Sequence, residues 1–558
     1  MSGLNESSRG RLAQYWCLIF VVALGAFSLR APRLCMRPMH TDEAVHADKY
    51  RLLLETGLYE YDPHEYHGPT LNYATRIAAR LQGARTYAEV TESTLRIVPV
   101  VFGTFLVLLI AGLRQGLGFA TVISAILVAL SPAMVYYSRY YIQEMLLACF
   151  TLGLLVCGYR YSRTRSLPWI FAAGAFAGLM HATKETAIIA FGAMGLALGV
   201  TILLQWDERR RAPAGVNWLH ILLGIGAAVV VSAMMYSVFL RRPEGILDSY
   251  RTYGIYFSRA GGENTAHVHP WHYYLQMLLY ARYFRGPIWT EVWIVVLALV
   301  GLIAAIRGLR VGLVDPKLVR FLAVYTIAMI VVYSAIPYKT PWCVLSFLTG
   351  LILLAGIGAV SLWTWAKLPV LRGIVAVLIL AGAGHLAFLA WRASFVYYAD
   401  SRNPYVYAHP TDEILVAVDT VRDYATTMGV GYSFERRLQI AVPGNDYWPL
   451  PWYFRDLPYV GYTSEVPHDI GPMILVSDAL EGALGRVFFE ETPVEQRRMY
   501  LYLFPAPHYL WARPGVRLVG FVRKDLWDEY AARQSDAMAL IEEAHERKAS
   551  TTSDAVRP

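Results

Sequence analysis

The sequence predicts a polytopic α-helical membrane protein that carries a soluble α/β domain near its C-terminal end. Hydrophobic residues make up 56% of the 558 residues, charged residues only 16%, and the mean hydropathy is +0.37. Soluble proteins contain about 25% charged residues, so most of this chain is too apolar to be soluble. The composition changes near residue 400, where apolar runs give way to the mixed pattern of a folded soluble domain.

The apolar part contains about eleven runs that approach the roughly 20 residues a helix needs to cross a bilayer. The fifth run is short. The runs lie at residues 14–31, 96–113, 118–136, 142–159, 168–182, 186–204, 218–240, 289–307, 319–336, 342–362 and 369–393.

The loops between these runs predict the orientation. With the N-terminus in the cytoplasm, the cytoplasmic loops are short and most are rich in Arg and Lys, as the positive-inside rule requires. The net charge of +8 therefore reflects membrane topology rather than nucleic-acid binding. We expect a multi-pass protein of the cell (inner) membrane, with the loops 32–95 and 241–288 and the C-terminal domain outside the cytoplasm.

The C-terminal region reads as short elements between Pro and Gly residues. "DEILVAVDTVRDYA" (412–425) predicts an amphipathic helix, and "RLQIAV", "PMILVSD" and "RMYLYLF" predict buried strands. The expected organisation is a membrane domain over 1–398, an extracytoplasmic α/β domain over 399–548 and a disordered tail over 549–558.

The first outer loop contains "HTDEAVHADKY", residues 40–50. Acidic residues favour a helix start, so a helix beginning near Thr41 would place Asp42 and His46 one turn apart. Two interpretations stay open. One is an interfacial helix with an acidic first turn; the other is a carboxylate that acts as general base, with imidazoles that hold it or a metal ion.

Basic residues recur in the other outer loops. Each cation alone is explained by snorkelling to the membrane interface. Together, beside a carboxylate cluster, they indicate an anionic ligand, and phosphate fits Arg and Lys best. These cations are Lys184 in "HATKETA", Lys339 in "IPYKTPWC", and Arg282 and Arg285 in "ARYFRGPIW".

Two further charges lie near membrane depth, where charges are costly and usually paired or functional. Arg139 and Glu144 in "SRYYIQE" either form an ion pair that fixes the loop or bind a ligand. His67 in "YHGPTL" is either a plain loop residue or part of the same site.

This ordered set resembles the GT-C membrane glycosyltransferases that are built like protein O-mannosyltransferases and the lipid A aminoarabinose transferase. That group has an acidic pair in the first outer loop, an "(H/K)PPL"-like element and a later Arg and carboxylate. The corresponding residues here are Asp42-Glu43, "HGPTL" (67–71), in which Gly68 replaces a proline, and Arg139 with Glu144. The segments "HTDEAVHA", "TKE", "YKTPW" and "YWPLPWYFRDLP" (447–458) are similar to the flippase-activity-associated subgroup of bacteria and archaea.

The resemblance implies transfer of a sugar from a polyprenyl-phosphate donor to a glycan, lipid or protein acceptor outside the cytoplasm, with inversion. Asp42 is then the first candidate for the general base and Glu43 the second. The implied ligands of the donor phosphate and sugar are Arg139, Glu144, Lys184, Lys339, Arg282, Arg285 and His67. Some members of the group use a divalent metal ion, for which His40 and His46 are the candidate ligands; no other cofactor is expected.

Two alternatives remain. A non-catalytic or transport-associated component of a surface-glycan flippase or export system would need polar residues at the membrane midplane, or would leave the charged cluster unexplained. A hydrolase of lipid-linked sugars would use nearly the same residues. The clean apolar spans favour the glycosyltransferase.

Overall fold

The computed structural model describes residues 6–64, 67–204, 217–260, 267–307 and 314–536, and the expected disordered tail lies outside these ranges. The chain divides into two compact units. The membrane unit contains Met1–Met36 and His46–Tyr407, and the C-terminal unit contains Arg37–Val45 and Ala408–Pro558. A short segment of the first outer loop thus groups with the end of the chain.

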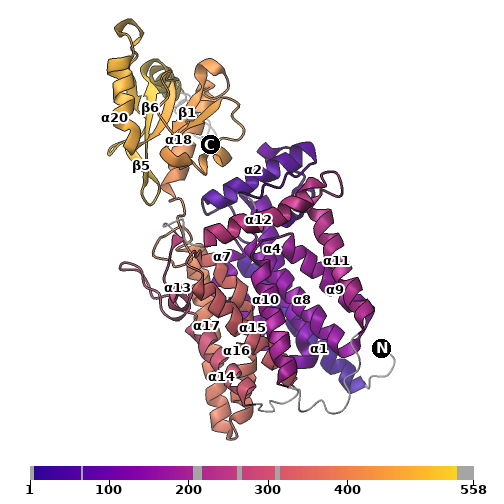
Figure 1. The fold of residues 1–558 in the computed structure, drawn as a ribbon. Helices are drawn as coiled ribbons and strands as arrows, with labels where there is room; N and C mark the ends of the chain where they lie inside the picture. Colours follow the sequence, from indigo (N-terminus) through magenta and orange to yellow (C-terminus); the bar gives the residue numbers. More distant parts are fainter. Residues whose placement is uncertain (1–5, 65–66, 205–216, 261–266, 308–313, 537–558) are drawn as a thin grey trace, which may run out of the picture. The chain divides into compact units, whose positions relative to one another are not determined.

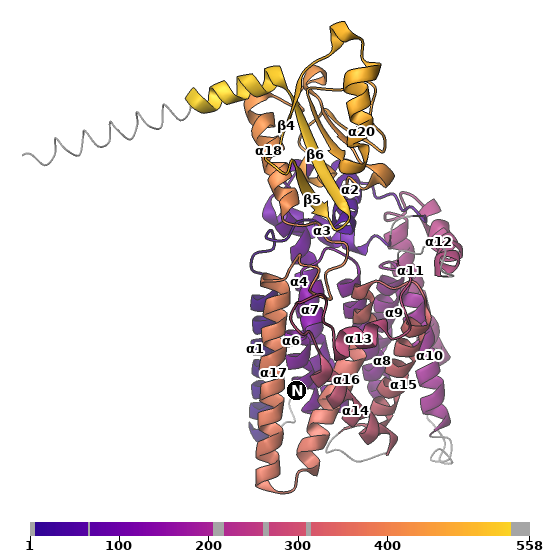
Figure 2. The same cartoon turned by 90° about the vertical axis from the view of Figure 1, so that its left-hand side faces the viewer.

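The membrane unit is a bundle of apolar helices that run side by side (Figures 1 and 2). Within the described residues, seven helices are long and apolar enough to span a membrane, and four apolar helices are shorter. The seven are α1 (Glu6–Arg30), α4 (Glu92–Ile110), α8 (Glu144–Thr164), α11 (Trp218–Tyr236), α15 (Pro316–Ala335), α16 (Leu345–Trp365) and α17 (Pro369–Phe395). The four are α6 (Ala120–Leu130), α9 (Leu167–His181), α10 (Ala187–Leu203) and α14 (Val292–Ile306). All eleven coincide with the predicted runs, which confirms a multi-pass helical membrane protein.

The third predicted run, 118–136, is broken into two helices. Helix α6 ends at Leu130 and helix α7 (Pro132–Tyr137) starts with a proline at its first position. A proline disfavours helical backbone in the residue before it, so Ser131 leaves the helix and caps α7 instead.

Helices α14 and α16 approach each other closely because glycines lie between them. A Cβ atom on Gly358 would lie 1.9 Å from the Leu297 carbonyl oxygen, and one on Gly301 would lie 2.1 Å from that of Leu354. Small residues that let backbones approach are the usual means of helix packing in membranes.

Polar helices occupy the predicted outer loops. These are α2 (Thr41–Thr56), α3 (Thr70–Gln82), α12 (Glu244–Ala260) and α13 (Tyr273–Leu279). Figures 1 and 2 show α3 and α12 at the same end of the helical bundle.

The C-terminal unit is a six-stranded mixed sheet in the order β2-β1-β3-β6-β4, with β5 also paired to β6. The strands are β1 (Leu438–Ala441), β2 (Val460–Thr463), β3 (Met473–Ser477), β4 (Tyr500–Tyr502), β5 (Tyr509–Arg513) and β6 (Val516–Arg523). Strands β2, β1 and β3 are parallel, and β6 is antiparallel to its three neighbours.

Helices cover both faces of this sheet. Helices α18 (Glu413–Met428) and α20 (Asp478–Arg486) lie on opposite sides of it in both views (Figures 1 and 2). Leu484 of α20 packs with Ile474, Val476 and Phe521 in the core. The predicted α/β domain is confirmed, and the predicted helix and three strands match α18, β1, β3 and β4.

Candidate active site

The "HGPTL" loop docks onto the turn between α9 and α10. The Gly68 N–H donates to the Thr183 carbonyl at 3.1 Å, and the Thr70 N–H donates to the Ala182 carbonyl at 3.3 Å. The Thr70 and Thr183 hydroxyls share a further hydrogen bond of 2.8 Å. The loop that follows the first outer helix is therefore fixed on the "HATKE" turn by backbone and side-chain contacts.

Glycine is required at position 68 by this docking. A Cβ atom there would lie 2.2 Å from the Ala182 carbonyl oxygen, which is far inside van der Waals contact. The replacement of proline by glycine in the "HGPTL" element is thus explained by the close approach of two backbones.

The same turn carries a buried ion pair. The Lys184 ammonium donates to Glu144 Oε1, and the exposed side-chain fractions are 8% and 3%. The second oxygen of Glu144, Oε2, is buried and has no hydrogen-bond partner in the described structure. The structure therefore pairs Glu144 with Lys184, and the alternative in which Arg139 and Glu144 form an ion pair is not observed among the described residues.

A second buried carboxylate lies beside this pair, and the sequence-based site did not include it. Glu185 accepts hydrogen bonds from His67 Nδ1 at 2.8 Å and from the Tyr61 hydroxyl at 3.2 Å. Burial alone would raise the pKa of Glu185, but the interactions with His67, together with a backbone hydrogen bond and the charge of Lys184, outweigh burial and hold that pKa below its ordinary value. In the sequence, the feature that could have identified Glu185 as a site residue is its position directly after Lys184 in "TKE".

His46 lies close to His67. The two imidazole rings have centroids 6.1 Å apart, and His46 Nδ1 is 3.5 Å from the Gln143 side-chain amide. The structure thus brings together five of the predicted or neighbouring site residues from four separate segments: His46, His67, Glu144, Lys184 and Glu185.

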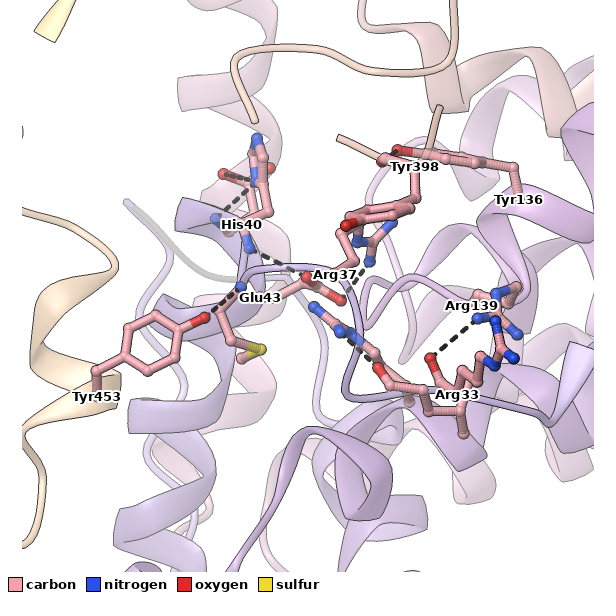
Figure 3. A network of polar contacts seen from close by, with 12 residues as sticks. Arg33, Arg37, His40, Glu43, Tyr136, Arg139, Tyr398 and Tyr453 are labelled. Atoms are coloured by element: carbon pink, nitrogen blue, oxygen red, sulfur yellow. Dashed lines mark hydrogen bonds and ion pairs between the residues drawn. The ribbon is translucent and has the colours of Figure 1, made fainter. Parts of the chain in front are cut away.

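Arg139 is held in a different environment. Its guanidinium donates to the carbonyl oxygens of Arg30 at 2.6 Å, Pro32 at 2.7 Å and Arg33 at 3.2 Å. Figure 3 shows the contact between Arg139 and Arg33. The residue fixes the chain where it leaves α1, and its ring-facing contact with Phe395, at 4.4 Å, packs the same guanidinium.

Lys339 lies in the turn after α15 and is almost fully buried, with 1% exposed. Its ammonium donates to the carbonyl oxygens of His269, at 3.1 Å, and Ile336. Among the described residues it has no carboxylate partner within ion-pair distance, and burial lowers its pKa. Lys339 is therefore a buried cation that backbone carbonyls hold and that no carboxylate of the described residues neutralises.

Arg282 and Arg285 are exposed in the loop between α13 and α14. Arg282 donates to the Gly286 carbonyl of its own loop at 3.1 Å. Within the described residues, neither arginine contacts Glu144 or Lys184, so the structure does not gather these two cations with the buried pair.

The acidic pair at the start of α2 belongs to the C-terminal unit, and its two members differ. Glu43 is fully buried and accepts from Arg37 at 2.9 Å and from the His40 N–H at 3.1 Å (Figure 3). Asp42 has 41% of its side chain exposed, and its carboxylate lies 3.9 Å from His40 Nδ1. Glu43 caps and anchors the segment, whereas the exposed carboxylate of Asp42 is accessible to a ligand.

The predicted metal ligands, His40 and His46, lie on either side of the first turn of α2. No group of three His, Cys, Asp or Glu side chains suited to a metal ion occurs among the residues described. A metal ion at His40 and His46 stays a prediction from the sequence.

Comparisons with known proteins support this architecture. Residues 66–236 match the family model for dolichyl-phosphate-mannose-protein mannosyltransferase, a range that includes the docked loop, Glu144 and Lys184. Protein O-mannosyltransferase 1 of Drosophila melanogaster is 25% identical over 42% of this chain. The match spans only 29% of that relative's length.

The fold is similar to that of ArnT from Cupriavidus metallidurans. The apo structure of ArnT aligns over 93% of this chain and 98% of its own, with a TM-score of 0.60 and 15% identity. The ArnT structure bound to undecaprenyl phosphate aligns over 91% and 98%, with a TM-score of 0.56 and 16% identity. The family match and the shared fold support the predicted resemblance to the GT-C membrane glycosyltransferases, while the closer subgroup stays a prediction.

Proposed function

We propose that this protein transfers a sugar from a polyprenyl-phosphate donor to an acceptor hydroxyl on the extracytoplasmic side of the membrane, with inversion at the anomeric carbon. The observation that carries the proposal is the set of buried charges at the loops of an otherwise apolar bundle. Lys184 is paired with Glu144, whereas Lys339 has no carboxylate partner among the described residues. The similar fold of ArnT, solved with undecaprenyl phosphate, supports a donor of this class.

Asp42 is the proposed general base. Glu43 is occupied by Arg37 and the His40 N–H, so its oxygens are engaged in holding the segment. Asp42 is exposed at the start of α2 and has no such bond to an arginine among the described residues. In this role it removes the proton of the acceptor hydroxyl as that oxygen attacks the sugar.

The reaction is a single displacement. The acceptor oxygen forms a bond to the anomeric carbon from the face opposite the phosphate, and the bond between that carbon and the phosphate oxygen breaks with its electrons. One displacement inverts the configuration, by the same logic as for inverting glycosidases. The polyprenyl phosphate leaves with the negative charge, which Lys339 and Lys184 stabilise electrostatically.

The other buried residues have positioning roles in this scheme. His67 and Glu185 fix the turn that carries Lys184, and Glu144 orients the Lys184 ammonium. Arg139 orders the chain between α1 and the acidic pair through the carbonyls of residues 30, 32 and 33. Arg282 and Arg285 remain candidate contacts for the donor at the exposed loop.

The central test replaces Asp42 by Asn in protein reconstituted into vesicles. We first identify the lipid that copurifies with the wild-type protein by mass spectrometry, and expect a polyprenyl-phosphate sugar. With that donor, Asp42→Asn is expected to reduce sugar transfer by about 10²- to 10⁴-fold, the usual contribution of a general base.

Asp48→Asn is the matched control for this variant. Asp48 lies on the same helix with a comparably exposed carboxylate, which pairs with Arg51 at 2.9 Å, and we expect its replacement to leave transfer unchanged. Wild-type turnover in Asp42→Asn would remove Asp42 as the base. A wild-type protein that binds and turns over no polyprenyl-phosphate sugar would refute the proposed reaction itself.

A further inference from the structure

The segment that carries Asp42 is held by the C-terminal unit. The Met39 N–H donates to the Tyr453 hydroxyl at 2.8 Å, and the imidazoles of His40 and His409 lie 4.7 Å apart. Figure 3 shows the Tyr453 hydroxyl directed at this segment. Residues 37–45 are therefore part of the packed structure of the C-terminal unit.

A third contact links the start of α2 to one edge of the sheet. Arg513, the last residue of β5, donates to the Thr41 hydroxyl at 3.2 Å and forms an ion pair with Asp446. Asp446 follows β1, and Thr41 directly precedes Asp42. A single arginine thus joins the residue next to the proposed base to the loop at the carboxyl end of β1.

That edge is the topological switch point of the sheet. Strand β1 lies between β2 and β3 in the sheet. After β1 the chain forms β2 on one side of β1 and then crosses over to form β3 on the other side. In open α/β sheets, ligands bind outside the carboxyl ends of the strands at this point. Because Ser477 at the end of β3 pairs with Leu518 near the start of β6, the hairpin that carries Arg513 lies at the same edge.

The side chains at this edge suit a hydroxyl-rich ligand. Asn445 accepts a hydrogen bond from the Ser464 hydroxyl at 3.0 Å, and both residues are exposed. The half-buried rings of Tyr447 and Tyr462 lie 5.2 Å apart. Carboxylates, amides and hydroxyls bond sugar hydroxyls, and the C–H face of a pyranose packs on an aromatic ring.

We propose that the switch-point edge, formed by Asn445, Asp446, Tyr447, Tyr462 and Ser464, binds the acceptor, and that this acceptor is a glycan. The inference rests on the proposed function, since it assigns the acceptor side of that reaction. Arg513 is a positioning residue, because its contacts with Asp446 and Thr41 set the place of Asp42 relative to this edge. The C-terminal unit thereby presents both the acceptor and the base that activates it.

The test separates acceptor binding from turnover. Full-length protein in vesicles is given the polyprenyl-phosphate sugar identified by mass spectrometry, and a glycan extract from membranes of host cells that lack the protein serves as acceptor. Tyr447→Ala is expected to raise the amount of extract needed for half-maximal transfer about tenfold, with the maximal rate retained. Tyr447→Phe keeps the ring and is expected to behave as wild type.

Tyr459→Ala is the matched control, because Tyr459 is an exposed tyrosine (45%) that immediately precedes β2, at the amino end of that strand. Arg513→Lys is expected to lower the maximal rate, since lysine cannot bridge Thr41 and Asp446 as a guanidinium does. An unchanged half-saturation in Tyr447→Ala, or a loss of maximal rate alone, would overturn the acceptor assignment. No transfer by the wild-type protein with any extract would instead refute the proposed function.

Discussion

Two cations that look equivalent in the sequence differ in the structure. Lys184 is paired with Glu144, whereas among the described residues the Lys339 ammonium contacts the carbonyl oxygens of His269 and Ile336 and no carboxylate. Sequence alone placed both in short turns beside apolar runs and could not tell which one has a carboxylate partner. That difference depends on which segments fold together, so it follows from the tertiary structure.

The difference predicts a specific loss of donor binding. Lys339→Met removes a cation without stranding a protein carboxylate, so the fold is expected to survive and affinity for the polyprenyl-phosphate donor to fall about 10- to 100-fold, as for loss of a charge-assisted bond. Binding of the donor to protein in nanodiscs measures this. Lys317→Met, at the exposed start of α15, is the control and should keep wild-type affinity; equal affinities in both variants would exclude a phosphate role for Lys339.

At the scale of elements, the sequence predicted the membrane-spanning helices but not the contacts that the loops make with one another. Apolar periodicity and length placed all eleven apolar helices, because bilayer thickness fixes the length of a span. The strands β2, β5 and β6 and the helix α20 were not predicted, since short strands depend on their neighbours in the sheet. The sequence could not decide whether Arg139 and Glu144 pair with each other, because their observed partners lie far away in the chain.

The docked "HGPTL" loop gives an element-scale prediction. Gly68→Ala places a methyl group against the Ala182 carbonyl, so the loop must move from the turn that carries Lys184. We expect a loss of about 1–3 kcal/mol in the free energy of unfolding, typical of overpacking, and faster amide hydrogen exchange in residues 182–186. Gly192→Ala is the control, because nothing lies within 4 Å of its added Cβ on α10. Unchanged stability and exchange in Gly68→Ala would contradict the docking.

The segment after α1 gives a second prediction at the scale of elements. Arg139→Lys removes the planar fork that reaches three carbonyls, so amide exchange in residues 31–36 is expected to rise and activity to fall about tenfold. If Arg139 instead bound the donor phosphate, donor affinity would fall while exchange stayed the same. Arg163→Lys, at the exposed end of α8, should change neither quantity.

At the scale of the whole molecule, the orientation in the membrane is the central prediction. In a variant whose five cysteines are replaced, Glu55→Cys on α2 is expected to react with a membrane-impermeant maleimide in intact cells. Lys317→Cys, at the start of α15, is expected to react only after the cells are broken, because basic loops stay in the cytoplasm. The opposite pattern would place the acidic pair inside the cell and end the proposal of an extracytoplasmic reaction.

The grouping of residues 37–45 with the C-terminal unit also bears on biosynthesis. The partners of Met39 and Thr41 lie 414 and 472 residues later in the chain. At about 5–20 residues per second, a ribosome needs roughly 20 to 100 seconds to make them after the acidic segment has emerged. A nascent or prematurely ended chain would therefore be inserted in the membrane with an unfinished reaction centre, so only a completed polypeptide would gain activity.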